Sequence, residues 1–260
     1  MADYVLIRKS RNVISSILHV ILNILLGVGS VAITVITGSW IIGLALVILS
    51  KWRVLAVRPR YWAINLLSNL TDFIVGASFV LIAYCSGTVW LPIHFVLMAG
   101  YVIWLVFLKS RSSEVAVEIQ ALTSVFLGIT ASVMLFASSN AIFMTITSML
   151  IGFSAMRHIL VQSDENEFGF LTLGTGLLSA EIAWLSNSWL IVYTFGTTGI
   201  MVPQLSIILT VLIFISSRIF KSGVFHGGKI NFSEIAAPII FSILIVTVLV
   251  IWFSNPIFDI

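Results

Sequence analysis

Two acidic residues lie inside long apolar segments of the sequence, and they are the residues best placed to do chemistry. Asp72 falls within the apolar run 61–84, and Glu181 falls within the run 168–195. A charge at the centre of a membrane costs at least about 2.5–3.5 kcal/mol, so such carboxyl groups usually face a bundle interior and often mark ion or proton paths. The alternative is a structural carboxyl that is protonated or bonded to a neighbouring helix.

Amide side chains accompany Asp72 at helical spacing. Asn65, Asn69 and Asp72 lie at positions i, i+4 and i+7, so they share one face of a helix. This face cannot point at lipid without leaving donors and acceptors unpaired. It therefore either lines a hydrated cavity or forms hydrogen bonds that hold an adjacent helix.

A second polar stripe lies in the first apolar run, where Ser15, His19 and Asn23 are spaced by four residues. A histidine inside a membrane can relay protons, because its unperturbed pKa is about 6.5. Alternatively, the ring simply bonds a neighbouring helix. His19 and Asn23 thus join Asp72, Asn69, Asn65 and Glu181 as candidates for a polar interior.

Signatures of catalysis and of cofactor binding do not occur in the sequence. It contains no HExxH motif, no Walker spacing and no nucleophile elbow. The single cysteine, Cys85, rules out an intrachain disulfide and a cysteine-based metal site. We therefore assign no catalytic residue, no metal and no cofactor. We also expect no nucleic-acid partner, since no motif for one is present.

The elements that must position these residues are membrane-spanning helices. The chain is 60% hydrophobic and only 9% charged, whereas soluble domains carry about 25% charged residues. Lipid is the solvent that accepts such a composition. We predict an all-α fold, a polytopic transmembrane bundle that forms a single domain over 1–260. About nine spanning helices are expected, at 13–36, 39–56, 61–84, 90–108, 115–137, 141–161, 168–195, 203–218 and 235–254.

The run 168–195 is compatible with two arrangements. It is either one long tilted helix or a helix followed by a short re-entrant segment, with a break at Ser186-Asn187-Ser188. Whether 186–200 is helical or re-entrant is left open.

The basic residues indicate how the chain is oriented. With a cytoplasmic N-terminus and alternating passes, all 13 basic residues fall on the cytoplasmic side, as the positive-inside rule favours. Two complete passes between Phe168 and Pro203 would invert the last basic loop, which favours one pass there. The basic residues are Arg8, Lys9, Arg11, Lys51, Arg53, Arg58, Arg60, Lys109, Arg111, Arg157, Arg218, Lys221 and Lys229.

One basic segment also suggests contact with lipid. Between Lys51 and Trp62, the residues Lys51, Arg53, Arg58 and Arg60 are interspersed with aromatic side chains. This pattern suits anionic lipid headgroups on the cytoplasmic side, at about 1 kcal/mol per basic residue. The plainer interpretation is that the segment only anchors the topology.

Part of the sequence carries a family resemblance. The stretch KWRVLAVRPRYWAINLLSNLTDFIVG, from Lys51 to Gly76, resembles a group of uncharacterised polytopic membrane proteins from candidate-phylum (Saccharibacteria-like) bacteria. The spacing of Lys109-Ser110-Arg111-Ser112-Ser113 and of Arg157-His158 is similar to theirs, and the similarity runs along most of the chain. The resemblance implies a bacterial cytoplasmic membrane. It implies no known activity and no functional residues.

Three functions fit these patterns. The first is a small-solute or ion transporter or channel that uses the intramembrane carboxylates. The second is a non-catalytic membrane scaffold or accessory subunit, whose polar stripes hold helices together. The third is a membrane-embedded lipid enzyme, which the short loops disfavour. The sequence indicates no substrate, and it leaves open a homo- or hetero-oligomer within the membrane. A water-accessible cavity round the polar stripes would favour transport, whereas paired carboxyls in a dry bundle would favour the scaffold.

Overall fold

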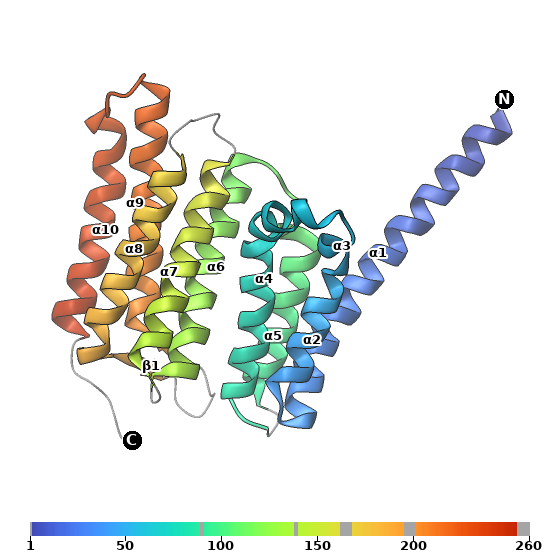
Figure 1. Ribbon diagram of the computed structural model, residues 1–260, viewed down its shortest axis with the longest axis horizontal. Coiled ribbons are helices and arrows are strands. Elements are labelled where there is room, and N and C mark those ends of the chain that lie inside the picture. The colour runs from blue at the N-terminus through green and yellow to red at the C-terminus, as the bar shows by residue number, and fades with distance from the viewer. Residues whose placement is uncertain (1, 89–90, 138–139, 162–167, 195–200, 254–260) are drawn as a thin grey trace.

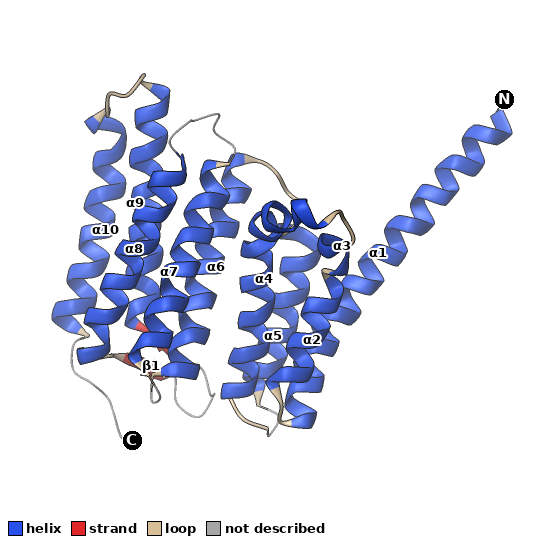
Figure 2. Cartoon of the chain, viewed as in Figure 1, coloured by secondary structure: helices blue, strands red, loops and turns tan. Residues whose placement is uncertain are grey.

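The computed structural model describes residues 2–88, 91–137, 140–161, 168–194 and 201–253, and Figure 2 shows that nearly all of them are helical. The expected bounds at 90, 195 and 254 and the loops 162–167 and 196–199 lie outside these residues. Within the described ranges, nine helices have 11 residues or more: α1 (Ala2–Thr37), α2 (Trp40–Ser50), α4 (Trp62–Cys85), α5 (Pro92–Ile103), α6 (Glu114–Phe136), α7 (Ala141–Leu160), α8 (Phe168–Ser186), α9 (Gln204–Phe225) and α10 (Phe232–Trp252).

Short elements connect or extend these helices. A single turn, α3 (Trp52–Leu55), follows α2, and the 3₁₀ turn η1 (Pro59–Tyr61) leads into α4. The π-helix η2 (Trp104–Leu108) continues α5. After α8 come the 3₁₀ turn η3 (Asn187–Trp189) and two short antiparallel strands, β1 (Val192–Thr194) and β2 (Met201–Pro203), in which Tyr193 pairs with Val202.

Six helical segments of the described chain are long and apolar enough to cross a membrane: Ser15–Thr37, Pro59–Cys85, Glu114–Phe136, Ala141–Leu160, Gln204–Phe225 and Phe232–Ile251. Two further apolar segments are shorter, namely α2 and the joined α5–η2, Pro92–Leu108. The helical class of the fold is therefore confirmed. A total of about nine spans stays a prediction.

The structure differs from the expected helices in four places. Helix α1 begins at Ala2, well before the expected start at residue 13. A continuous helix over 39–56 is wrong, because α2 ends at Ser50 and α3 starts a separate turn. A single helix over 168–195 is also wrong beyond Ser186, where η3 and β1 follow, whereas the alternative break at Ser186-Asn187-Ser188 is confirmed as the end of α8. The helix expected over 203–218 is longer and runs on to Phe225. Apolar composition alone cannot separate a helix end from an apolar turn or strand, which explains the third difference.

The helices pack side by side round two adjoining cores (Figure 1). One core lies among α1, α2, α4 and α5 and includes Val31, Val75 and Tyr101. The other lies among α6, α7, α8 and α9 and includes Val125 and Leu209. Helix α4 joins the two halves, because it contacts α2 on one side and α6 and α7 on the other.

The two ends of the bundle differ in charge. Figure 1 shows α3 and the α9–α10 connection toward one end, and β1 at the opposite end. The basic residues near helix ends, such as Lys51, Lys109 and Lys221, belong to the end with α3. We call it the basic end.

Candidate functional site

Near the middle of α4, the carboxylate of Asp72 is surrounded by three polar groups from other segments. Lys109 Nζ lies 2.9 Å from Asp72 Oδ2, and Lys51 Nζ contacts the same oxygen. Trp104 Nε1 donates to Oδ1 over 2.9 Å. We call these four residues the Asp72 cluster.

The Asp72 cluster forms because two neighbouring elements end beside α4. Lys51 is the residue that follows α2, and Lys109 is the residue that follows η2. In η2, the π-helical turn carries Trp104, whose ring is buried. Asp72 is itself only 14% exposed. A buried carboxylate is stable only when its charge is paired. Here Oδ1 accepts a hydrogen bond from Trp104, and Oδ2 is paired with the two ammonium groups.

This geometry corrects two expectations. Lys51 is not available to lipid headgroups, because its ammonium is largely buried against Asp72. Asp72 is also not isolated deep in apolar surroundings, since it lies at the level where α2 and η2 end. Of the other expected headgroup residues, Arg58 and Arg60 are exposed, and the Arg60 guanidinium lies 4.7 Å from the centre of the Tyr61 ring. The side chain of Arg53 lies outside the described part of the structure.

A second buried carboxylate, Glu118 of α6, was missed in the sequence. Its side chain is 5% exposed. Glu118 Oε2 lies 3.0 Å from Lys221 Nζ and 3.2 Å from Arg218 Nη2, both on α9. Ser217 of the same helix donates to Oε1 over 2.9 Å. We call these residues the Glu118 cluster.

One signal could have identified Glu118 as buried. Its position one turn into its helix indicates only a boundary residue. However, Ser217, Arg218 and Lys221 are spaced so that they share one face of α9. An amphipathic polar face near the end of an otherwise apolar helix needs an acceptor, and Glu118 is the acidic residue of α6 that can reach it.

The side chain of Gln120 lies between the two clusters and bonds to three other residues. Its Nε2 donates to the carbonyls of Leu108 and Arg111, over 2.6 and 2.9 Å. Its Oε1 lies 2.8 Å from Nε2 of His158 on α7. Buried Gln120 therefore holds the end of η2, the turn before α6 and the end of α7 together.

The asparagines predicted to accompany Asp72 stay on the same helix as expected but do not bond to it. Asn69 Nδ2 donates to the Asn65 carbonyl over 2.9 Å, within α4. Both side chains are partly exposed. The neighbour that joins α4 to another helix at this level is Thr71, whose hydroxyl lies 3.1 Å from that of Ser154 on α7.

The stripe on α1 faces outward. His19 is exposed and Asn23 is partly exposed, and Asn23 Nδ2 lies 3.1 Å from His19 Nδ1. Figure 1 shows the N-terminal part of α1 extending away from the other helices. An interior position for His19 is therefore wrong within one copy of the chain.

Glu181 also lies on the surface, so its expected interior position is wrong as well. Because α8 ends at Ser186, Glu181 lies only five residues from the helix end and not near the middle of a long helix. It borders a shallow cavity of about 400 Å³, lined by Thr145, Leu177, Ala180, Glu181, Trp184 and Leu185.

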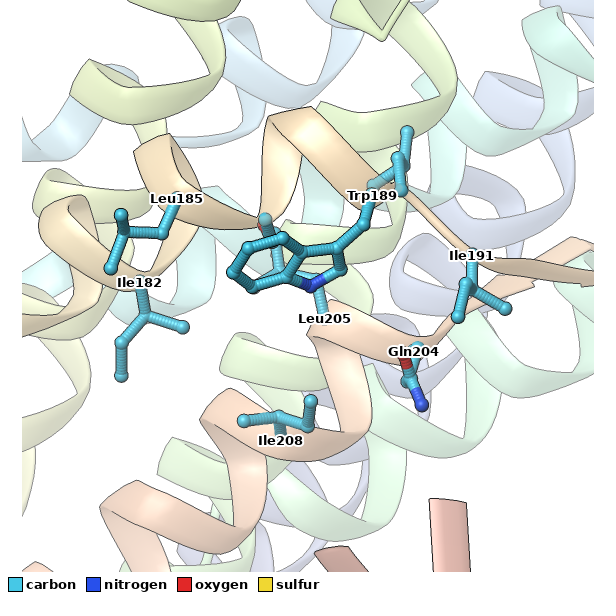
Figure 3. Close-up of a pocket in the computed structure, with 9 residues that line it drawn as sticks. Ile182, Leu185, Trp189, Ile191, Gln204, Leu205 and Ile208 are labelled. Carbon is cyan, nitrogen blue, oxygen red and sulfur yellow. The ribbon is translucent and has the colours of Figure 1, made fainter. Parts of the chain in front are cut away.

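Another cavity lies at the end opposite the two clusters. It has a volume of about 260 Å³ and lies between the end of α8 and the start of α9. Figure 3 shows the indole of Trp189 between Leu185 and Ile191, with Gln204 at one margin. Its lining is mostly apolar, so it suits an apolar group rather than an ion. Neither this cavity nor the one at Glu181 is lined by Asp72 or Glu118.

The arrangement of charges suits structural pairing better than bond chemistry. Each cluster has one carboxylate that is held by two basic groups from other segments. Within the described ranges, no group of three or more His, Cys, Asp or Glu side chains could hold a metal ion.

Comparison with known proteins adds no relative to this description. No family model matches the chain, and no similar curated protein or solved structure was found.

Proposed function

We propose that this chain is a multi-pass membrane protein that acts as a non-catalytic scaffold or accessory subunit. The observation that carries the proposal is the pairing of both buried carboxylates, Asp72 and Glu118, with basic residues from other helices. An ion or proton path needs a carboxylate that can exchange its partners. Here each carboxylate is instead held by basic groups from two positions outside its own helix.

The setting proposed for the bundle is a bacterial cytoplasmic membrane with the N-terminus inside. The six long apolar segments support insertion, and the positive-inside rule supports the orientation. Passes by α2, α5–η2 and α8 would bring the total to nine. Helix α2 alone, with 11 residues, reaches about 17 Å across a hydrocarbon core of about 30 Å. Exposed Arg58 and Arg60 favour anionic lipids on this side.

The scaffold proposal is tested by removing the charges of the Asp72 cluster together. The variant Asp72→Asn with Lys51→Met and Lys109→Met has no charge left to pair. Replacing a buried ion pair by neutral groups of similar size is often neutral or stabilising, by about 1–4 kcal/mol. We expect this triple variant to fold, with thermal stability in detergent equal to that of wild type.

Asp72→Asn alone is the matched control, because it leaves both lysines without a counter-charge. We expect it to be destabilised by about 3–5 kcal/mol, as for other broken buried pairs. Proton and sodium flux into proteoliposomes is measured in parallel. Flux in wild type that is lost in a stably folded triple variant would overturn the scaffold proposal.

A second candidate, an ion transporter, is favoured by one observation. The π-helix η2 places Trp104 against Asp72, and π-helical turns frequently occur at functional sites. A transporter would use the shift between π- and α-helical hydrogen bonding to release Asp72. It requires saturable proton or sodium flux in wild type that Trp104→Phe lowers without loss of folding.

A further inference from the structure

Residues 15–25 of α1 are exposed in one copy of the chain, apart from Asn23, which is half-buried. Ile17, Leu18, Leu22 and Leu25 are each more than half exposed. Further along the helix, Ser30, Val31, Thr34 and Val35 are fully buried against the bundle. The same helix is therefore packed at one end and bare at the other.

The bare half carries the polar stripe of Ser15, His19 and Asn23. The apolar segment of α1 begins at Ser15. At 1.5 Å per residue, His19 lies about 6 Å and Asn23 about 12 Å into it. In hydrocarbon, an unpaired amide or imidazole is strongly unfavourable, because no water is present to bond to it. The stripe therefore needs a partner at that depth.

The bond within the stripe determines which groups still need partners. Asn23 Nδ2 donates to His19 Nδ1 over 3.1 Å. With Nδ1 as the acceptor, the proton of the neutral ring is on Nε2. Two groups then remain on the surface of α1, a donor at His19 Nε2 and an acceptor at Asn23 Oδ1, and neither has a bond to another described residue.

We propose that α1 of a second copy of this chain covers the stripe, in a parallel and symmetric pair. Under two-fold symmetry, His19 of each copy donates to Asn23 of the other copy. The free donor and the free acceptor of both copies then each have a partner. Two copies with the same orientation in the membrane place their stripes at the same depth. A partner of different sequence would need a donor and an acceptor at matching heights. The inference holds whether the bundle is a scaffold or a transporter.

Cross-linking of the full-length chain in lipid bilayers tests which face of α1 contacts the second copy. Single cysteines are placed in a Cys85→Ala background. Ser15→Cys lies on the stripe, and Ile17→Cys lies about 200° away on the same helix. Both positions are exposed. Oxidation should link Ser15→Cys into a species of twice the mass and leave Ile17→Cys monomeric. Equal linking at both positions, or linking of Ser15→Cys only to a protein of another mass, would overturn the proposal.

The hydrogen bonds are tested by the dimer dissociation constant, measured from energy transfer between labelled copies. His19→Leu with Asn23→Leu should weaken association roughly tenfold or more, since each interhelical bond in a membrane contributes modestly. The exchanged variant, His19→Asn with Asn23→His, keeps one donor and one acceptor and should restore most of the affinity. Thr37→Val is the control, because its hydroxyl bonds only to Ile33 of its own helix. A chain that stays monomeric at every protein-to-lipid ratio, or an unaffected leucine variant, would refute the pairing.

Discussion

Glu118 of α6 and Lys221 of α9 lie 103 positions apart in the sequence, yet the carboxylate and the ammonium meet over 3.0 Å at the basic end of the bundle. Arg218 approaches the same oxygen from the next turn of α9. A single carboxylate thus joins the first turns of one helix to the last turns of another.

Glu118→Gln should destabilise the protein by about 1–3 kcal/mol, because charged hydrogen bonds are lost and two cations keep no counter-charge. The cations are partly exposed, which limits the effect. The measurement is thermal unfolding in detergent. Glu114→Gln is the matched control, since Glu114 is exposed in the first turn of the same helix, and its effect should stay below about 1 kcal/mol. Equal effects of the two changes would contradict the role of the Glu118 cluster.

Gly152→Ala should push α7 and α8 apart. A methyl group at this position would clash with the Ser179 hydroxyl and would lie 3.2 Å from the Thr175 carbonyl. Overpacking of this kind costs about 1–3 kcal/mol. Gly174→Ala, where a methyl group meets nothing within 4 Å, should be neutral or stabilising by up to about 1 kcal/mol. Thermal unfolding of both variants in detergent gives the change in stability for each. If both changes had the same sign, close packing of α7 and α8 would be contradicted.

Gln120→Leu should loosen the turn between η2 and α6, since Leu108 and Arg111 lose the donor to their carbonyls. With about 1 kcal/mol for each bond, hydrogen exchange of the amides in 109–113 should accelerate roughly tenfold or more. Gln204→Leu makes the same change at the opposite end of the bundle and should leave these amides unaffected. Unchanged exchange in the Gln120 variant would show that the turn is held by other contacts.

The proposed orientation is tested with single cysteines in a Cys85→Ala background. Thr88 and Ser112 are both exposed and lie at opposite ends of the bundle. A membrane-impermeant maleimide should label Thr88→Cys in intact cells, and should label Ser112→Cys only after the cells are opened. The reverse result would invert the topology.

Hydropathy was sufficient to place most helices, because a lipid-facing helix must be apolar over its whole length. It failed at Lys51, where a basic residue after an apolar run has the pattern of a headgroup anchor. The residue is instead drawn inward by Asp72, which lies 21 positions later in the sequence. Local pattern gives no information on such long-range pairing.

The candidate site was predicted only in part for the same reason. Asp72 stands out because an acid inside an apolar run is unusual. Glu118 does not, since one turn from a helix end is an ordinary place for an acid. Glu181 was placed too deep because the end of α8 at Ser186 is followed by apolar turns and a strand that prolong the apolar run. The stripe on α1 was recognised as a face, but sequence spacing does not say whether the covering helix belongs to the same copy.

The long separation between Glu118 and Lys221 also affects the order in which the helices can pack during synthesis. Ribosomes add about 5–20 residues per second, so the 103 residues between them take about 5–20 s to make. During that interval α6 exists without the basic residues of α9, and its carboxylate has no cation from that helix. Asp72 has a basic partner as soon as it is synthesised, because Lys51 precedes it in the chain. The order of synthesis therefore lets the α1–α5 half of the bundle close first, and α6 can bury Glu118 as a charged group only after α9 has emerged.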